Sequence, residues 1–443
     1  MSSAPHADST YDLIVVGAGA AGLLGAARAA ELGKRVLLLE KNRKPGVKIL
    51  ISGGTRCNVT HDCDARGIRD AFGSAGSFLH SPLAALGPRE VVELFHAEGV
   101  PTYVEPETGK VFPRTDRAVD IADALVRRLK RSGAELALAE PVEAIERVPA
   151  DAGDGSGATS FRVVTSKRTP IAPKLLITTG GKSYSGCGTT GDGYAWLAAL
   201  GHTIRPPRPA LVPLTTDDAW VRELSGIAIP DTLLRVVDAQ DPASGNAPPK
   251  RRIRGLPPGV LIERRGATLF THHGLSGPAP LDVSRAVTGA KRPGDVLLLA
   301  DFFPDVSDAA LDEQLRAAAA RDGKKLALAL VPDLLPRRLV EALFMQAGIP
   351  HERRAAELGK SERAKLVETL KRARIRTSGS RGFDKAEVTA GGVALDEVDS
   401  RTMQSKLVPG LYLAGEILDF DGFIGGYNFQ AAFSTAWLAA SSV

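Results

Sequence analysis

Short apolar runs alternate with segments of helical spacing along this chain, and the alternation is typical of an α/β fold. Residues 11–16, YDLIVV, are apolar and β-rich, as a buried parallel strand requires. The Ala- and Leu-rich stretch that follows predicts a helix ending at Gly33, and RVLLLE predicts a second strand ending at Glu40. The order strand, helix, strand predicts a βαβ unit at the start of the chain.

The middle of the chain continues this mixed pattern. Residues 41–60 are rich in Gly and polar side chains and predict a long structured loop. Helical spacing recurs over 83–100 and 118–131, and apolar β-rich runs over 134–178 predict several strands. This first part of the chain therefore predicts one α/β domain.

The pattern changes near residue 205, where RPPRPALVPL is Pro-rich and is typical of a linker. Short apolar runs with turns over 211–303 predict a β-rich segment, and residues 307–376 predict several helices. Strand patterns return from 386, and FQAAFSTAWLAA predicts a closing helix. The predicted parts are a discontinuous Rossmann-type domain of residues 1–204 and 380–443, a β-rich inserted subdomain of residues 205–305, and a helical inserted subdomain of residues 306–379.

Composition narrows the class of protein. A hydrophobic share of 44% and a charged share of 24% exclude a wholly disordered chain. Three cysteines without C-x-x-C spacing exclude a disulfide scaffold and a multi-cysteine zinc module, and we predict no metal site. No apolar run has the roughly 18 residues that a membrane helix needs, and the polar start of the chain shows no secretory signal. These observations predict a cytoplasmic protein without membrane contact.

The strongest motif is Gly17-x-Gly19-x-x-Gly22, which directly follows the first strand and opens a helix. The first glycine allows a tight turn, the second lets the backbone approach a pyrophosphate, and the third permits close helix–strand packing. Glu40 stands at the end of the second strand, where a carboxylate can bind the adenosine ribose. The residues predicted to contact a dinucleotide here are Gly17, Ala18, Gly19, Ala20, Ala21, Gly22, Glu40 and Lys41.

Two further glycine elements decide which dinucleotide is expected. An acid at position 40 disfavours NADP at this site and leaves NAD and FAD. LLITTGG and LYLAGEILDFDGFIGGYNFQAA resemble the middle and C-terminal motifs of flavoproteins that have two dinucleotide-binding domains. A second helix N-terminus after the last glycine pair stabilises the negative charge of reduced flavin, which favours FAD. The predicted contacts are Thr179, Gly180, Gly181, Gly415, Glu416, Gly425, Gly426, Tyr427 and Asn428.

Residues 46–60 predict a second wall of the same site. Consecutive glycines allow the chain to pass close to a cofactor, and the polar side chains around them can bind phosphates or flavin heteroatoms. Cys63 does not stand at C-x-x-C spacing from Cys57, so we expect Cys57 to be a packed thiol rather than one partner of a redox pair. The alternative is a capped surface loop. The predicted contacts are Lys48, Ser52, Gly53, Gly54, Arg56, Cys57 and Asn58.

A family resemblance covers the chain from about residue 11 to its end. GVKILISGGTRCNVT, GKVFPRTD, THHGLSGPAPLDVSR and TAGGVALDEVDSRTMQSKLVPGLYLAGEILDFDGFIGGYNFQAAFSTAW resemble the bacterial aminoacetone oxidase-like or bile-acid-inducible NAD(P)/FAD-dependent oxidoreductases. The resemblance implies FAD and a Rossmann-type core that is interrupted by a β-barrel-like and a small helical subdomain. Thr55 stands where the family motif varies.

The sequence supports three classes of function. The first is an FAD-dependent oxidoreductase that transfers hydride at flavin N5 to or from a small organic substrate, with O₂ or NAD(P)H as the second partner. No second GxGxxG with a strand, helix and acid is present, so NAD(P)H is expected to bind only transiently. The alternatives are a flavin-dependent RNA-modifying enzyme and a non-catalytic FAD-binding protein. Candidate catalytic or pocket-lining residues are His272, His273, Lys182, Tyr184 and Tyr427.

The charge distribution bears on a nucleic-acid partner. The formal net charge is +5, and residues 351–382 hold ten Lys or Arg against four Glu. Aromatic side chains are not interleaved with these charges, and their spacing is typical of solvated helix faces with ion pairs. This pattern disfavours nucleic acid as a partner and leaves the oligomeric state open.

Overall fold

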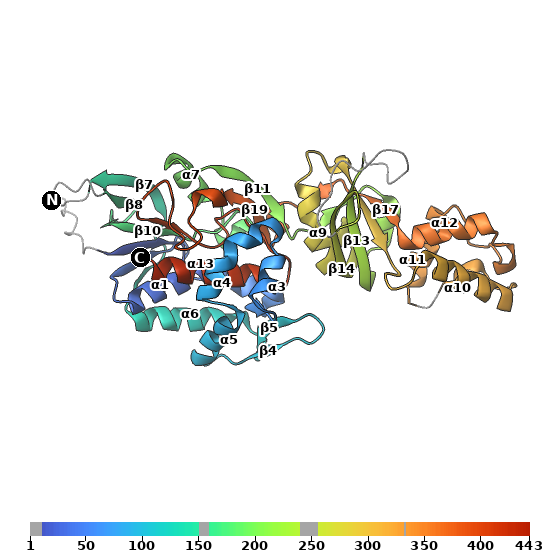
Figure 1. The fold of residues 1–443 in the computed structure, drawn as a ribbon, viewed down its shortest axis with the longest axis horizontal. Coiled ribbons are helices and arrows are strands. Elements are labelled where there is room, and N and C mark those ends of the chain that lie inside the picture. The colour runs from blue at the N-terminus through green and yellow to red at the C-terminus, as the bar shows by residue number, and fades with distance from the viewer. Residues whose placement is uncertain (1–10, 150–158, 240–255, 332–333) are drawn as a thin grey trace. The chain divides into compact units, whose positions relative to one another are not determined.

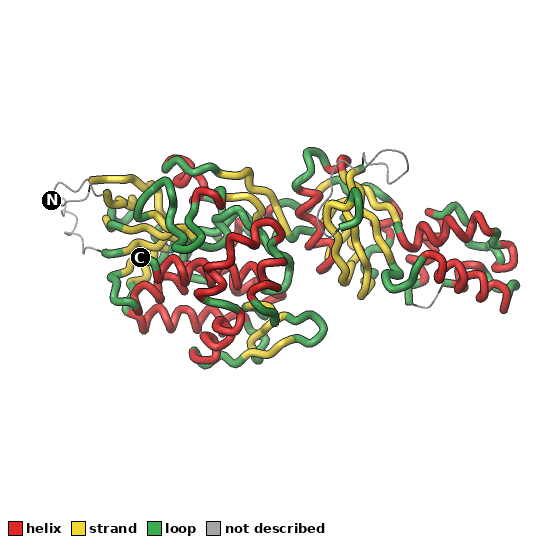
Figure 2. The backbone as a smooth tube through the Cα atoms, in the orientation of Figure 1, coloured by secondary structure: helices red, strands yellow, loops and turns green. Residues whose placement is uncertain are grey.

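The computed structural model describes residues 11–149, 159–239, 256–331 and 334–443. They form two compact units, one made of the chain up to Arg208 and from Glu387 onwards, and the other of Pro209–Ala386 (Figures 1 and 2). The chain therefore leaves the first unit once and returns to it. The division of the inserted unit into a β-rich and a helical part, at residues 205, 306 and 380, stays a prediction.

A parallel five-stranded sheet lies at the centre of the first unit, which confirms the predicted Rossmann-type α/β class. Its strands, in spatial order, are β20 (Leu411–Leu413), β10 (Lys174–Ile177), β1 (Leu13–Val16), β2 (Val36–Leu39) and β6 (Glu135–Ala137). Every neighbouring pair is parallel. All four residues of β1 and of β2 are buried, which explains why both strands are continuous apolar runs.

Three helices pack beside this sheet, namely α1 (Ala20–Glu31), α6 (Ala118–Ser132) and α13 (Tyr427–Ser441). Helix α1 contacts both of the others (Figure 1). The backbones of α1 and α13 approach so closely that a Cβ added at Gly25 would lie 3.4 Å from the carbonyl oxygen of Ala436. The closing helix is therefore held against the first helix of the βαβ unit, although the two helices belong to opposite ends of the sequence.

Smaller elements complete the first unit. They are α2 (Val47–Ile51), α3 (Ala65–Asp70), α4 (His80–Ala85), α5 (Pro88–Ala97), α7 (Asp192–Ala199), β3 (Thr60–His61), β4 (Thr102–Val104), β5 (Lys110–Pro113), β7 (Val142–Pro149), β8 (Thr159–Thr165), β9 (Ile171–Ala172), β11 (Ile204–Ala210) and β19 (Val388–Val393). The prediction of a continuous loop over residues 41–60 was wrong in part, because α2 and a 3₁₀ turn lie within it. Helix α2 buries Ile49 in the core. The Gly-rich composition of the segment favoured a loop and gave no indication of this buried residue.

An antiparallel seven-stranded sheet forms the second unit. Its spatial order is β17 (Ala373–Arg376), β16 (Val296–Asp301), β13 (Ala228–Asp238), β14 (Val260–Thr271), β15 (Gly274–Ser276), β12 (Leu214–Thr215) and β18 (Gly379–Ser380). The helices are α8 (Ala219–Glu223), α9 (Pro278–Thr288), α10 (Asp308–Arg321), α11 (Arg337–Gln346) and α12 (Lys360–Lys371). The helical prediction for 307–376 was wrong at residues 373–376, where burial alternates as in a strand.

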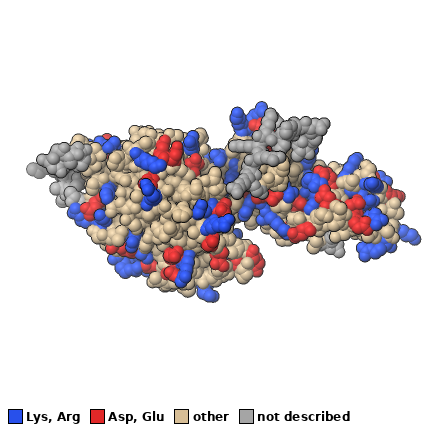
Figure 3. Space-filling model, viewed as in Figure 1, with Lys and Arg blue, Asp and Glu red and all other residues tan. Residues whose placement is uncertain are grey.

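The charged helices of the second unit carry many ion pairs. Arg363 bonds Asp312 at 2.6 Å, and Arg372 bonds Asp308 at 2.5 Å. Figure 3 shows basic and acidic side chains interleaved on the visible face of this part. These contacts agree with the predicted solvated, paired helix faces. Among the described helices, none is both long and apolar enough to span a bilayer.

Candidate dinucleotide site

The carboxyl ends of the parallel strands bring together three predicted glycine clusters. Strands β1, β10 and β20 run in the same direction, so the residues that follow them lie at one edge of the sheet. A Cβ added at Gly17 would lie 2.8 Å from the carbonyl oxygen of Thr178, and one added at Gly415 would lie 3.1 Å from the Cβ of Ala21. The glycine turns after these strands are therefore direct neighbours.

The GxGxxG turn has the geometry that its sequence predicts. Gly17 has a φ of 100°, a conformation that side chains with a Cβ rarely adopt. A Cβ at Gly22 would lie 1.8 Å from the carbonyl oxygen of Gly17, whereas one at Gly19 would meet nothing within 4 Å. Helix α1 begins here without a side-chain cap and without an acid in its first turn. Its first N–H groups and its positive dipole end are available to an anion.

Glu40 is buried at the end of β2 and holds the adjoining backbone. Its Oε2 accepts a hydrogen bond from the N–H of Ala18 at 2.7 Å, and its Oε1 accepts one from the N–H of Asn42 at 2.8 Å. A carboxylate has further lone pairs, so the side chain can still accept bonds from ribose hydroxyls. Lys41 points elsewhere, because its Nζ contacts Asp192 at 2.5 Å at the start of α7.

The turn after β10 leaves one buried polar atom without a partner. The hydroxyl of Thr179 is buried and makes no hydrogen bond within the described residues. A Cβ added at Gly181 would lie 2.3 Å from Oγ1 of Thr389 and 2.8 Å from Oε1 of Glu416. The glycine pair therefore allows three chain segments to meet, and the Thr179 hydroxyl lies against Gly193 of α7.

A cluster around Glu416 joins four segments of the first unit. Its Oε2 accepts from Lys48 Nζ at 2.7 Å, and its Oε1 accepts from Ser183 Oγ and from the N–H of Thr389, each at 2.8 Å. Lys48 Nζ also donates to Ser183 Oγ at 2.6 Å. The structure thus brings two predicted residues, Lys48 and Glu416, into direct contact. No sequence pattern indicated Ser183 or Thr389, although Ser183 stands just after the predicted glycine pair.

The second uncapped helix end belongs to α13. Gly425 and Gly426 have φ values of 132° and 94°, and a Cβ at Gly426 would lie 2.3 Å from the carbonyl oxygen of Thr60. The ring of His61 stacks on Tyr427 with centroids 4.6 Å apart, and its Nδ1 lies 3.1 Å from the carbonyl oxygen of Gly425. Strand β3 therefore supports the first turn of α13, which carries no acid and no side-chain cap.

Polar side chains fix the loop before α13. The side-chain amide of Asn428 accepts from the N–H of Gly422 at 2.8 Å and donates to the carbonyl of Gly422 at 3.1 Å. Thr60 Oγ1 donates to Gln430 Oε1 at 2.6 Å, and both residues are buried. Thr60, His61 and Gln430 were not among the residues predicted from the sequence. The only signal was that Thr60 closes the NVT end of the distinctive Gly-rich motif.

The Gly-rich turn of residues 52–58 is conformationally strained. Gly53, Gly54, Thr55 and Cys57 all have φ between 54° and 71°. Arg56 Nη1 contacts Glu105 at 3.1 Å, and its guanidinium lies 3.9 Å from the centroid of the Phe112 ring. Ser52 Oγ donates to the carbonyl of Ile49 at 2.7 Å, and the side chain of Asn58 is buried beside Gly53. Strain of this kind is concentrated at functional sites, which favours a role for the turn.

Replacing Thr55 by glycine is expected to stabilise the protein by about 1 kcal/mol. The threonine is exposed, so no packing is lost, and its φ of 71° costs a β-branched residue roughly 1–3 kcal/mol. Part of this gain is lost because glycine gives up more backbone conformational entropy on folding than threonine does. Urea unfolding measures the difference. Thr203→Gly is the control, since Thr203 is exposed without a positive φ, and a loss of stability is expected there.

Cys57 is a buried thiol whose pKa is raised to about 12, chiefly because burial disfavours the thiolate. Burial likewise raises the pKa of Cys63 to about 11 and raises that of Cys187. All three cysteines are free. These environments stabilise the protonated thiols at neutral pH, and thiolates are the reactive form in redox exchange. The geometry supports the predicted packed thiol beside the turn.

Iodoacetamide is expected to leave Cys57 unmodified in the folded protein at pH 8 and to alkylate it once urea unfolds the chain. The unfolded thiol titrates near pH 8.5, so the folded state alone retains the proton between roughly pH 8.5 and about 12. Stability is therefore expected to fall as the pH rises through that window. Peptide mass spectrometry gives the extent of alkylation, and rapid native modification of Cys57 at pH 8 would contradict the buried placement.

The remaining catalytic candidates lie in different places. Tyr184 directly follows Ser183 of the Glu416 cluster, has a φ of 53°, and burial raises its phenol pKa. His272 and His273 form the exposed turn between β14 and β15, in the second unit. The glycine turns all belong to the first unit. Their catalytic role stays a prediction.

The residues of the first unit fit a dinucleotide. Two helix N-termini without caps can bind a pyrophosphate and a negatively charged ring edge. Glycines 17, 22, 181 and 426 leave no room for a side chain, while Gly19 faces open space. The spare acceptor capacity of Glu40 adds a polar partner. A bound flavin dinucleotide would bring redox chemistry to this edge of the sheet.

Comparisons with known proteins extend over almost the whole chain. The family described as "HI0933-like protein Rossmann domain" matches residues 11–442. A relative from Escherichia coli (strain K12) named "Ribosomal RNA dihydrouridine synthase" is 34% identical over 98% of both chains. One of the same name from Haemophilus influenzae is 32% identical over 97% of this chain and 98% of its own. The "3-dehydro-bile acid delta(4,6)-reductase" of Clostridium scindens is 27% identical over 96% of this chain and 97% of its own.

These comparisons test two predictions made from the sequence, the family and the absence of a nucleic-acid partner. The similarity to a bile-acid reductase agrees with the bile-acid side of the predicted family, while the aminoacetone oxidase-like naming stays a prediction. The expectation that nucleic acid is not a partner is not supported, because two full-length relatives carry the name of an enzyme for ribosomal RNA.

Proposed function

We propose that this chain, which belongs to the HI0933-like Rossmann family, is an FAD-dependent reductase that converts a uridine of ribosomal RNA to dihydrouridine. The observation that carries the proposal is the 34% identity to a ribosomal RNA dihydrouridine synthase over 98% of both chains. The similarity spans the dinucleotide site and the inserted unit alike. Of the three predicted classes of function, this choice favours the RNA-modifying enzyme over the enzyme for a small organic substrate.

The reaction adds one hydride and one proton across the C5–C6 double bond of the uracil ring. FAD, when bound and reduced, supplies the hydride at N5, and NADPH or NADH is the proposed external reductant. The first N–H groups of α1 would bind the pyrophosphate, and Glu40 would bind the ribose. The dipole at the start of α13 would favour negative charge on the reduced cofactor. The sequence has no second GxGxxG that is combined with a preceding strand, a following helix and an acid, so we infer that the nicotinamide binds transiently.

A second candidate function is the reduction of a steroid-like small molecule. The relative from Clostridium scindens favours it, because its name describes a reductase of double bonds in a bile acid. Its identity of 27% is lower than that of the two ribosomal RNA enzymes. Both candidates reduce a carbon–carbon double bond, so the same dinucleotide site serves either one. They differ in the substrate that the enzyme must accommodate, a ribosomal RNA or a steroid-like small molecule.

The test uses purified protein, FAD and NADPH. Flavin bands near about 370 and 450 nm are expected after FAD addition and gel filtration, and they should bleach on reduction. Ribosomal RNA transcribed without modifications should then gain two hydrogens at a uridine, as nuclease digestion and mass spectrometry show. Bleaching that is reversed by a bile-acid dienone and not by RNA would select the second candidate. Absence of flavin binding would refute both.

A further inference from the structure

The edge strand β17 carries two arginines on its exposed face. Burial alternates along it, with Ala373 and Ile375 buried in the second core and Arg374 and Arg376 exposed. The strand pairs with β16 on one side and ends the sheet on the other. Packing therefore requires the alanine and the isoleucine, and it does not require the arginines.

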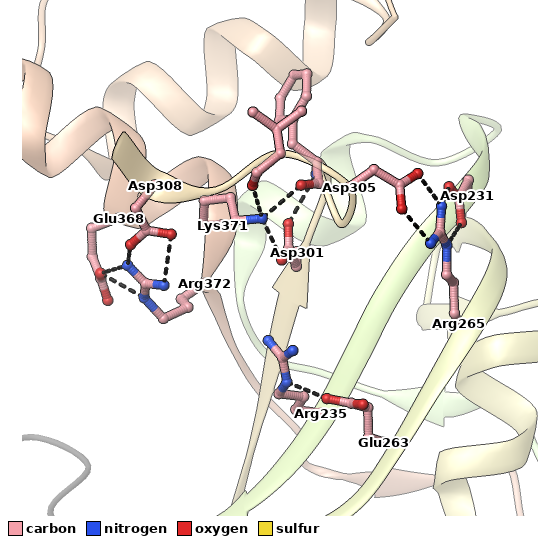
Figure 4. Close-up of polar contacts among 12 residues, drawn as sticks. Asp231, Arg235, Glu263, Arg265, Asp301, Asp305, Asp308, Glu368, Lys371 and Arg372 are labelled. Atoms are coloured by element: carbon pink, nitrogen blue, oxygen red, sulfur yellow. Dashed lines mark hydrogen bonds and ion pairs between the residues drawn. The ribbon is translucent and has the colours of Figure 1, made fainter. Parts of the chain in front are cut away.

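Other arginines near this sheet are neutralised by acids. Arg235 bonds Glu263 at 2.5 Å, Arg264 bonds Asp282 at 2.9 Å, and Arg372 bonds Asp308 at 2.5 Å. Figure 4 shows how closely the guanidiniums of Arg235, Arg265 and Arg372 face their carboxylates. An arginine paired with a carboxylate forms a nearly neutral pair, which attracts an external anion only weakly.

Arg374 and Arg376 differ from these neighbours. Within the described residues, neither guanidinium makes an ion pair or a side-chain hydrogen bond with an acid. Asp218 lies next to Arg376, but its carboxylate accepts from the backbone N–H at 2.8 Å. The two side chains leave the same face of the strand at positions about 6.6 Å apart, so they can contact two different phosphates.

The surface around the two arginines is suited to a backbone contact rather than to base recognition. Leu299 of β16 lies opposite Arg374 and Leu297 lies opposite Arg376, and both leucines are half-buried. Strand β17 itself has no aromatic side chain on which a base could stack. Contacts to phosphates position a protein on RNA without reading its sequence.

We propose that the exposed face of β17, centred on Arg374 and Arg376, binds the phosphate backbone of the RNA substrate. The proposal rests on the function proposed above, because the complementary charge that it requires is supplied by ribosomal RNA. The observation behind it is that, in the part of the chain that the structure describes, both guanidiniums are exposed and neither is paired with an acid. The surface places the RNA, and the chemistry remains with the first unit.

Fluorescence anisotropy with a labelled ribosomal RNA fragment tests the surface. The double variant Arg374→Ala/Arg376→Ala is expected to bind about tenfold more weakly, and the slope of log K against log salt should fall by about 2. The control is Lys360→Ala/Lys365→Ala, which removes the same charge from exposed lysines of α12 in the same unit. The control should change the affinity less than twofold. Arg374→Lys/Arg376→Lys should keep most of the salt slope.

Each outcome bears on one proposal at a time. Equal losses in the two alanine variants would show a general charge effect and would overturn the surface proposal. The surface proposal would also be overturned if Arg374→Ala/Arg376→Ala bound RNA with wild-type affinity and formed dihydrouridine at the wild-type rate. That result would leave the proposed function intact. Salt-dependent RNA binding that is lost only in the arginine variant, without any dihydrouridine product, would support the surface and refute the reaction. If duplex DNA or heparin bound with equal affinity and the same dependence on the two arginines, the surface would be a site for polyanions in general and not for RNA.

Discussion

Gly22→Ala is expected to abolish FAD binding. A Cβ at this position would lie 1.8 Å from the carbonyl oxygen of Gly17 and 2.6 Å from Oγ1 of Thr178. Neither neighbour can move freely, because Gly17 lies in a turn with positive φ and Thr178 Oγ1 bonds the carbonyl oxygens of Val16 and Gly17. The turn must open and tilt the start of α1 away from the pyrophosphate. Flavin absorbance that stays with the protein after gel filtration measures the loss.

Gly19→Ala separates cofactor contact from damage to the fold. Its Cβ would meet no protein atom within 4 Å, and the φ of −81° suits any residue. The stability of the cofactor-free protein should change by less than about 1 kcal/mol, the size of an N-cap effect. The affinity for FAD should nevertheless fall at least tenfold, because the methyl group would occupy the closest approach to the phosphates. Undiminished FAD binding by Gly19→Ala would mean that the pyrophosphate lies elsewhere.

Local spacing accounts for what could be predicted from the sequence. The first two strands, the GxGxxG turn and the acid at position 40 are close together in the sequence, so one βαβ unit fixes their geometry. The glycine pair after β10 and the A-G-E after β20 were predictable because the carboxyl ends of parallel strands share one edge. Gly17 and Gly22 behave as expected because their role depends only on backbone that is close in sequence.

Long-range pairing accounts for what was missed. His61 meets Tyr427 from the opposite end of the sequence, and Thr389 meets Glu416 only because β19 runs beside the loop that follows β20. No spacing rule predicts such partners. Lys41 and Arg56 are each paired with an acid, Asp192 and Glu105, that sequence spacing did not indicate, and their contacts with a cofactor stay predictions. A cation in a Gly-rich segment indicates an anion nearby, but the fold decides whether that anion is a ligand or a side chain.

Asp301→Ala is expected to destabilise the second unit by about 3–5 kcal/mol. Its Oδ2 lies 2.8 Å from Lys371 Nζ, and the two side chains are only 5% and 7% exposed (Figure 4). The ammonium also donates to the carbonyls of Phe303 and Val306, which ties the end of α12 to the segment after β16. Removing the carboxylate leaves a buried charge that the two carbonyls do not neutralise.

Tryptophan fluorescence measures this loss in the relevant unit. Trp220 is the one tryptophan in the sequence between residues 209 and 386, so Trp196→Phe/Trp437→Phe provides a background in which it reports unfolding.

Asp231→Ala is the matched control, because Asp231 pairs with Arg265 at a surface where the arginine side chain is 44% exposed and the aspartate side chain 46%. Because water screens that pair, Asp231→Ala is expected to change the free energy of unfolding far less. Lys371→Met in the Asp301→Ala background should recover stability, since it removes the unpaired charge and keeps the volume. Equal losses for Asp301→Ala and Asp231→Ala would show that the buried pair does not hold the unit together.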